Sequence, residues 1–191
     1  MSYKFAKIPV NTFKQIQINA GVVCTTFNPE PDAGEANVTD EDILGATSGG
    51  NNFTAVPTFS DRGEDIDNCP KNMAELKNLD AWEVKLSGTF VTITAKLAKK
   101  LTAAADEATG KVTPRNTLVI EDFGDIWLIG DYGDGGVVAI HILNALSTGG
   151  FSIQTADKSK GKFPFEFTGH YKMSAQDTPP FEIYVSEGEA A

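Results

Sequence analysis

Residues 82–90 read WEVKLSGTF, a stretch in which apolar and polar side chains alternate. The even positions from Trp82 to Phe90 are apolar or glycine, and the odd positions from Glu83 to Thr89 carry charges or hydroxyls. A period of two with one apolar side is typical of a β-strand that is buried on one face. We therefore expect a half-buried strand whose even positions face the core.

The same alternation returns in residues 163–172, FPFEFTGHYK. Because Pro164 has no backbone N–H to donate to a ladder, its strand should lie at a sheet edge or begin near that residue. A short final strand is expected from Phe181 to Val185, after the turn at Pro179 and Pro180. The apolar face of the 163–172 strand is predicted to carry Phe163, Phe165, Phe167, Gly169 and Tyr171.

Two more strands are expected from Ile126 to Ile129 and from Val137 to Leu143. The residues between them include DYGDGG at 131–136, which tolerates the positive φ that a hairpin turn needs. Both strands are apolar on both faces, so each face should contact protein. We expect one face in the core and the other against a neighbouring subunit.

One amphipathic helix is predicted from Ala95 to Ala105, with Thr94 as its N-cap and Gly110 just beyond its end. A turn of helix is expected after Pro70, and residues 28–52 are expected to form a long acidic loop. Together these elements predict a mainly β fold with one α-helix. A single domain should span residues 1–191.

The 191 residues carry a formal net charge of −10, and most of it falls within residues 30–67. That segment holds ten acidic residues and one base, Arg62. Such a block is usually a solvated loop region. A surface of this sign repels phosphate, which argues against a protein that grips DNA and suits a surface past which DNA moves without being held.

The N-terminal residues MSYKFAK are basic, but no apolar run follows them, so no signal peptide is predicted. The longest apolar stretch, Val137 to Leu143, is too short to span a bilayer. The two cysteines, Cys24 and Cys69, make no disulfide framework, and we expect both thiols to stay reduced in a cytoplasm.

No set of residues indicates an enzyme. His141 lies in an apolar stretch and His170 on a polar strand face, and neither belongs to a motif with a nucleophile. Residues 48–50, SGG, lack the lysine of a phosphate-binding loop. Asp122 and Asp125 flank a glycine turn, where aspartate commonly serves the backbone. We therefore expect no catalytic and no cofactor-binding residue.

Metal binding is not expected either. Residues 61–67, DRGEDID, resemble a calcium loop but lack glycine at the sixth position and the terminal glutamate. The two cysteines and the two histidines show no metal-binding spacing.

Six segments carry a resemblance to a known family: residues 3–13 (YKFAKIPVNTF), 45–53 (GATSGGNNF), 63–70 (GEDIDNCP), 82–90 (WEVKLSGTF), 144–151 (NALSTGGF) and 165–171 (FEFTGHY). They resemble segments of the major tail tube proteins of phages and prophages of Gram-positive bacteria. The resemblance runs nearly end to end, and its motifs are structural rather than catalytic.

The resemblance implies an antiparallel β-sandwich or partly closed barrel of the phage tail tube type, with one helix packed at its side. It also implies that the subunit forms hexameric rings, which stack into the tube of a non-contractile tail and form the channel for genome delivery. The implied partners are further copies of the chain and the tape-measure, tail terminator and distal tail proteins. DNA would pass through the lumen without specific binding, and the acidic balance leads us to expect more carboxylates than amines there. The implied location is the virion tail, after assembly in the host cytoplasm.

Two other functions remain open at this point. The first is the inner tube of a contractile tail, phage-like bacteriocin or injection system, which a neighbouring sheath gene would favour. The second is a carbohydrate-binding or enzymatic β-sandwich, which would need an exposed aromatic platform or a carboxylate pair.

Overall fold

A computed structural model of the chain describes residues 12, 14–17, 19–29, 38–131, 133 and 135–186. Most of the N-terminal segment 3–13 lies outside these residues, and so do Glu30, Asp32 and Glu35 of the long loop. Tyr132 and Asp134 of the expected hairpin turn also lie outside them.

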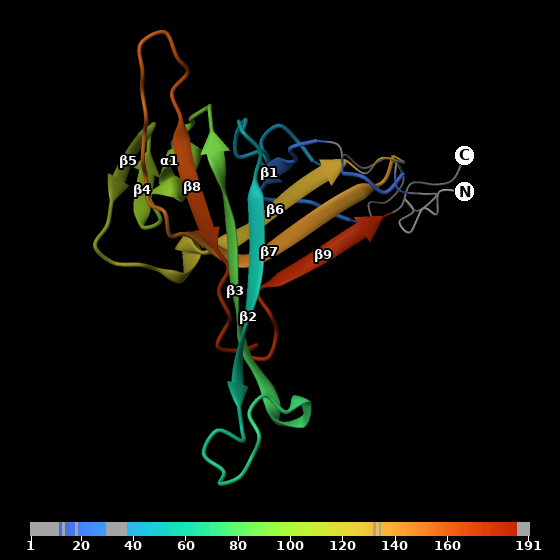
Figure 1. The fold of residues 1–191 in the computed structure, drawn as a ribbon. Helices are drawn as coiled ribbons and strands as arrows, with labels where there is room; N and C mark the ends of the chain where they lie inside the picture. Colours follow the sequence, from blue (N-terminus) through green and yellow to red (C-terminus); the bar gives the residue numbers. More distant parts are fainter. Residues whose placement is uncertain are drawn as a thin grey trace, which may run out of the picture.

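The described residues form nine strands, one α-helix and two short 3-10 helices (Figure 1). The strands are β1 (Val22–Cys24), β2 (Asn52–Asp61), β3 (Lys77–Phe90), β4 (Ala105–Ala108), β5 (Lys111–Pro114), β6 (Gly124–Asp131), β7 (Val137–Ser147), β8 (Phe163–Thr168) and β9 (Phe181–Ser186). The helices are η1 (Ala74–Leu76), α1 (Ala95–Leu101) and η2 (Ile120–Asp122).

Six strands pair antiparallel along the path β1-β6-β7-β8-β3-β2, and β9 joins them as the seventh strand of the sheet by pairing with β7. β7 connects two groups of strands, because its first half pairs with β6 and β9 and its end pairs with β8 through Leu146 and Ser147. As a result, β1-β6-β7-β9 and β2-β3-β8 cross at an angle in Figure 1. The predicted mainly β, antiparallel fold with one α-helix is confirmed. The arrangement is sandwich-like, and the described strands do not close into a barrel.

The main core lies between these two groups of strands. Phe90 of β3 is fully buried and stacks on Phe165 of β8, with ring centroids 4.3 Å apart. α1 adds Leu97 and Leu101, both buried, to the same cluster. The remaining buried members come from β1, the following loop and the other strands of the two groups: Val23, Leu44, Val84, Leu86, Ile126, Leu128, Ile142, Ala145, Phe163 and Phe167.

The two alternating stretches form strands as predicted, and β3 and β8 pair with each other. β8 begins at Phe163, so Pro164 is its second residue and lies near the start of the strand, as predicted. The strand ends at Thr168, earlier than the alternation predicts. Tyr171 therefore lies beyond the strand, where its hydroxyl accepts a hydrogen bond from the backbone N–H of Trp82 at 2.8 Å.

β6 and β7 form the predicted hairpin, and both faces of this hairpin are covered. One face belongs to the main core, and the other carries a smaller cluster around Trp127. Phe27, from the segment after β1, packs edge-on against Trp127 with ring centroids 5.4 Å apart, and Ala139 is fully buried beside them. The chain itself therefore covers this part of the second face, where we expected a neighbouring subunit.

The helix is shorter than its amphipathic pattern predicts. Thr94 caps it as expected, since its side-chain oxygen accepts from the backbone N–H of Leu97 at 3.1 Å. However, α1 ends at Leu101, because Ala103 has a φ of 65° that leaves the helical region. Ala105, predicted as the last helical residue, is the first residue of β4.

β1, β2, β4 and β5 were not predicted from the sequence. Gly110, expected just beyond the helix, lies in the β4–β5 turn with Thr109, and both have positive φ, as a two-residue hairpin turn requires. β2 has only weak alternation, because its inward positions include the small Ala55 and the ring of Pro57. The turn of helix expected after Pro70 is η1.

Candidate assembly surfaces

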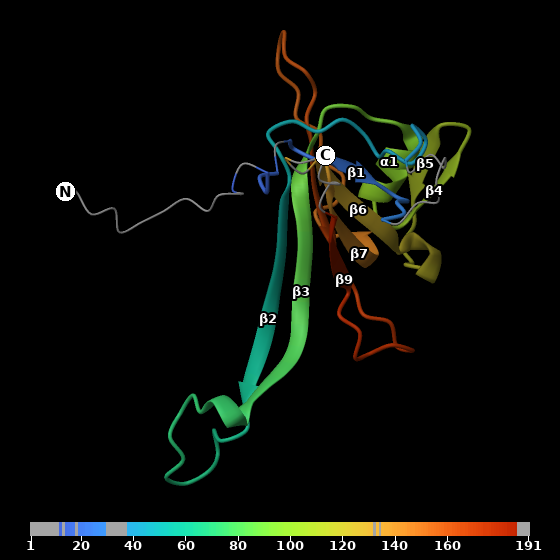
Figure 2. The ribbon, with the colours of Figure 1, turned by 90° about the vertical axis from the view of Figure 1, so that its right-hand side faces the viewer.

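The β2–β3 hairpin extends well beyond the two packed groups of strands (Figures 1 and 2). We call its projecting part, residues 59–79, the arm. Phe59 is 57% exposed, and Ile66, Met73 and Leu79 are exposed as well. A two-stranded hairpin alone is marginally stable in water, and apolar side chains gathered at a projecting end are typical of a protein contact. The arm is therefore the first candidate for a binding surface.

The end of the arm is a folded loop that Asp61 holds together. The two carboxylate oxygens of Asp61 accept hydrogen bonds from the backbone N–H groups of Gly63 and Asn72 at 3.0 and 3.1 Å. These hydrogen bonds, the one from Gly63 first, lower the pKa of Asp61. Lys77 approaches the same carboxylate at 3.8 Å. The leading aspartate of the calcium-like segment thus serves its own backbone.

The second candidate surface is the side of the β2-β3-β8 group that faces away from the core, which we call the outer face. Its side chains are mostly polar, and Lys85 pairs with Glu83 at 2.5 Å. β2 ends the path of paired strands, so one backbone edge of this face has no strand beside it among the described residues. The outer face comprises Thr54, Val56, Thr58, Glu83, Lys85, Ser87, Thr89, Pro164, Glu166 and Thr168.

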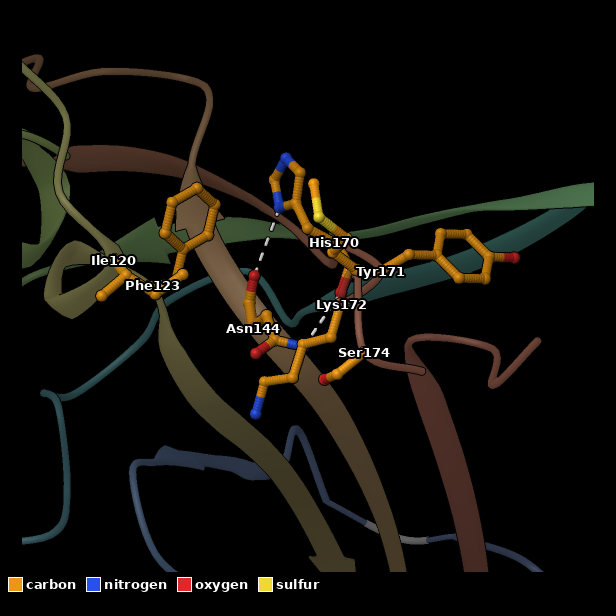
Figure 3. Close-up of a pocket in the computed structure, with 8 residues that line it drawn as sticks. Ile120, Phe123, Asn144, His170, Tyr171, Lys172 and Ser174 are labelled. Carbon is orange, nitrogen blue, oxygen red and sulfur yellow. Dashed lines mark hydrogen bonds between the residues drawn. The ribbon is translucent and has the colours of Figure 1, made fainter. Parts of the chain in front are cut away.

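The third candidate surface is a largely apolar pocket of about 500 Å³, lined by residues of η2, of β7 and of the segment that follows β8 (Figure 3). His170 organises one wall: its Nδ1 lies 3.2 Å from the carbonyl oxygen of Asn144, and Phe123 packs edge-on against its ring. Met173, at 89% exposed, and Ile120 form an uncovered apolar rim. The full lining is Ile120, Phe123, Asn144, His170, Tyr171, Lys172, Met173 and Ser174.

His141 lies in β7, and its contacts are structural. Its ring stacks on Trp127 with centroids 3.9 Å apart. Its two nitrogens face carboxylates, Nδ1 at 3.2 Å from Glu182 and Nε2 at 3.4 Å from Asp125. A hydrogen bond from the Tyr184 hydroxyl, and then one from His141, lower the pKa of Glu182. Within the described residues neither nitrogen contacts a serine or cysteine, and the cluster links β6, β7 and β9.

The other residues considered for a site lie far apart in the fold. Cys24 is buried in β1, Cys69 is in the arm and His170 lines the pocket. Residues 48–50 form a turn that leads into β2, with two successive glycines at positive φ. In the part of the chain that the structure describes, no three histidine, cysteine, aspartate or glutamate side chains gather in a way that could hold a metal ion.

Asp122 and Asp125 both bind backbone groups, as their position beside a turn predicts. Asp122 is buried, accepts from the backbone N–H of Val119 at 2.9 Å and pairs with Arg115. Asp125 accepts from the backbone N–H of Asn144 at 3.0 Å.

No family model and no curated protein matches this chain. None of the helices in the described residues combines the length and the apolar content needed to cross a lipid bilayer.

Proposed function

We propose that the chain is the major subunit of a bacteriophage tail tube, which associates into rings that stack around a central channel. The arm is the observation that carries this proposal. It exposes Phe59, Ile66 and Leu79 on a hairpin that has no core of its own. A neighbouring subunit that covered these side chains would remove the cost of their exposure and stabilise the hairpin.

The outer face supports the same proposal, because its chemistry suits a channel wall. The charged groups of this face are the two carboxylates of Glu83 and Glu166 and the single ammonium of Lys85. The other side chains of this face are small, and most carry hydroxyls. A duplex that moves past such a wall meets no excess of ammonium groups. Each phosphate contact that is avoided lowers the slope of log K against log salt concentration by about one unit, so binding to the wall is weaker. We propose that the outer face lines the lumen.

The edge of β2 provides a route to ring closure. Pairing this edge with the neighbouring subunit would satisfy its free backbone groups and leave no open edge in a closed ring. Pro57 lies in the middle of β2 and donates no hydrogen bond, so the pairing would be interrupted there.

Deleting the arm tests the proposal. A variant in which residues 59–79 are replaced by an Asn-Gly turn keeps the strand pairs of the core and should remain folded, with the near-UV circular dichroism of its tryptophans unchanged. The parent protein, concentrated at neutral pH, should form tubes visible by negative-stain electron microscopy, whereas the variant should remain small in sedimentation velocity. Tubes formed equally well by the armless variant would contradict the proposed role of the arm.

A further inference from the structure

Opposite ends of the β2-β3-β8 group carry loops of opposite charge. One is the β7–β8 loop, residues 148–162, which extends past the end of β8 where Phe90 pairs with Phe163. The other is the tip of the arm, residues 62–76, which joins β2 to β3 at the far end of the same strands. Figures 1 and 2 agree on this placement.

The β7–β8 loop is basic and exposed. It contains three lysines, Lys158, Lys160 and Lys162, and only one acidic residue, Asp157. All four side chains are exposed. None of the three lysines has an ion-pair partner within the described residues. The loop also exposes the apolar side chains of Phe151 and Ile153.

The arm tip is acidic and exposed. Its four acids, Glu64, Asp65, Asp67 and Glu75, outnumber its two bases, Arg62 and Lys71. The three acids at 64, 65 and 67 have no ion-pair partner in the part of the chain that the structure describes. Ile66, between them, and Met73 are exposed apolar side chains. Each loop thus presents unpaired charge of one sign around a small apolar centre, which is the composition of a complementary pair.

We infer that the arm tip of one copy binds the β7–β8 loop of the next copy. The two surfaces differ, so the contact is head-to-tail, and each bound copy offers a free loop to another. This inference rests on the proposed function, in that it identifies the contact between successive rings. β3 has 14 residues. At about 3.3 Å per residue β3 alone spans ~45 Å, and both loops extend past its ends, so the copies would repeat at ~45 Å or more along the strands.

Charge reversal in a mixing experiment tests this contact. The arm-reversed variant carries E64K, D65K and D67K, and the loop-reversed variant carries K158E, K160E and K162E. In each variant alone the arm and the loop have the same sign, so the critical concentration for association should rise at least about tenfold. An equimolar mixture restores opposite signs at every contact and should associate close to the parent concentration. Sedimentation velocity at low salt measures each case.

A control reverses Lys99 and Lys111, which lie on α1 and β5 and belong to neither loop. This control should associate like the parent. The inference would be overturned if the two charge-reversed variants associated like the parent. It would also be overturned if their mixture had the same critical concentration for association as each variant alone. Association that follows the charge pattern without rings or tubes in electron micrographs would leave the inference standing and reject the tail tube. A parent that stays monomeric at every concentration would reject both.

Discussion

Replacing Gly88 with alanine has two opposing effects in the centre of the β2-β3-β8 group. Alanine has the higher strand propensity, but its Cβ has to fit into a packed core. Gly88 lies opposite Phe165 in the β3–β8 register. An added Cβ would lie 2.5 Å from Oδ1 of Asn51 and 2.9 Å from two ring carbons of Phe165. Phe165 is buried between Phe90, at 4.3 Å, and Phe167, at 5.3 Å, so its ring has little room to move.

The two effects have opposite signs and different sizes. Glycine inside a strand is about 0.5–1 kcal/mol less favourable than alanine, so propensity alone predicts stabilisation. Overpacking of a filled core costs about 1–3 kcal/mol, and the short contacts place Gly88→Ala in that class. We therefore expect a net loss of about 1–2 kcal/mol in the free energy of unfolding. For a chain of this length that lowers Tm by roughly 2–8 °C.

Thermal unfolding of the unassembled protein, followed by circular dichroism, measures this change. The matched control is Gly161→Ala, whose added Cβ would lie 3.8 Å from the ring of Phe163, an ordinary contact. That control should match the parent or exceed it slightly. A Gly88→Ala protein as stable as the parent would refute the reasoning that Phe165 fills the space above Gly88.

Thr94→Ala removes the N-cap of α1 and should lower the free energy of unfolding by about 1 kcal/mol, whereas Thr94→Ser should retain it; urea denaturation compares the three proteins. Burial raises the pKa of the Cys24 thiol to about 11, so at pH 8 a thiol reagent should label Cys69 at once and Cys24 only after unfolding. Hydrogen bonds from a tyrosine hydroxyl and a histidine ring lower the pKa of Glu182 below its ordinary 4.5. The stability that this carboxylate contributes is complete above about pH 4.5 and is lost as the pH falls through the lower, folded-state pKa. Glu182→Gln should therefore lose less stability than the parent between about pH 5 and pH 3, and equal losses in acid denaturation would contradict this.

The large, regular apolar positions were the predictable part of the fold. Phe163, Phe165 and Phe167 alternate without interruption, and so do Val84 and Leu86, which is why β3 and β8 could be predicted. β2 could not be, because its inward face offers a small side chain and a proline where a core strand normally has large ones. The helix was predicted too long because alanines 103–105 favour a helix locally, although the tertiary structure places the last of them in β4.

The candidate surfaces were less accessible to prediction because they depend on register and on loops that meet across the fold. The pocket brings Phe123 together with His170 and Met173, which only the pairing of the strands can do. Likewise, His141 meets Glu182 because β9 pairs with β7 in one register, and a shift of one residue would separate them. The arm was only partly visible in the sequence, as an acidic segment without a strand assigned on its N-terminal side.

Electron microscopy of the purified, concentrated full chain tests the central claim most directly. We predict hollow tubes built from stacked rings that repeat regularly along the tube. The six-fold symmetry implied by the resemblance would appear in end views. A protein that remains monomeric, or that forms only irregular aggregates across concentration and ionic strength, would contradict the account.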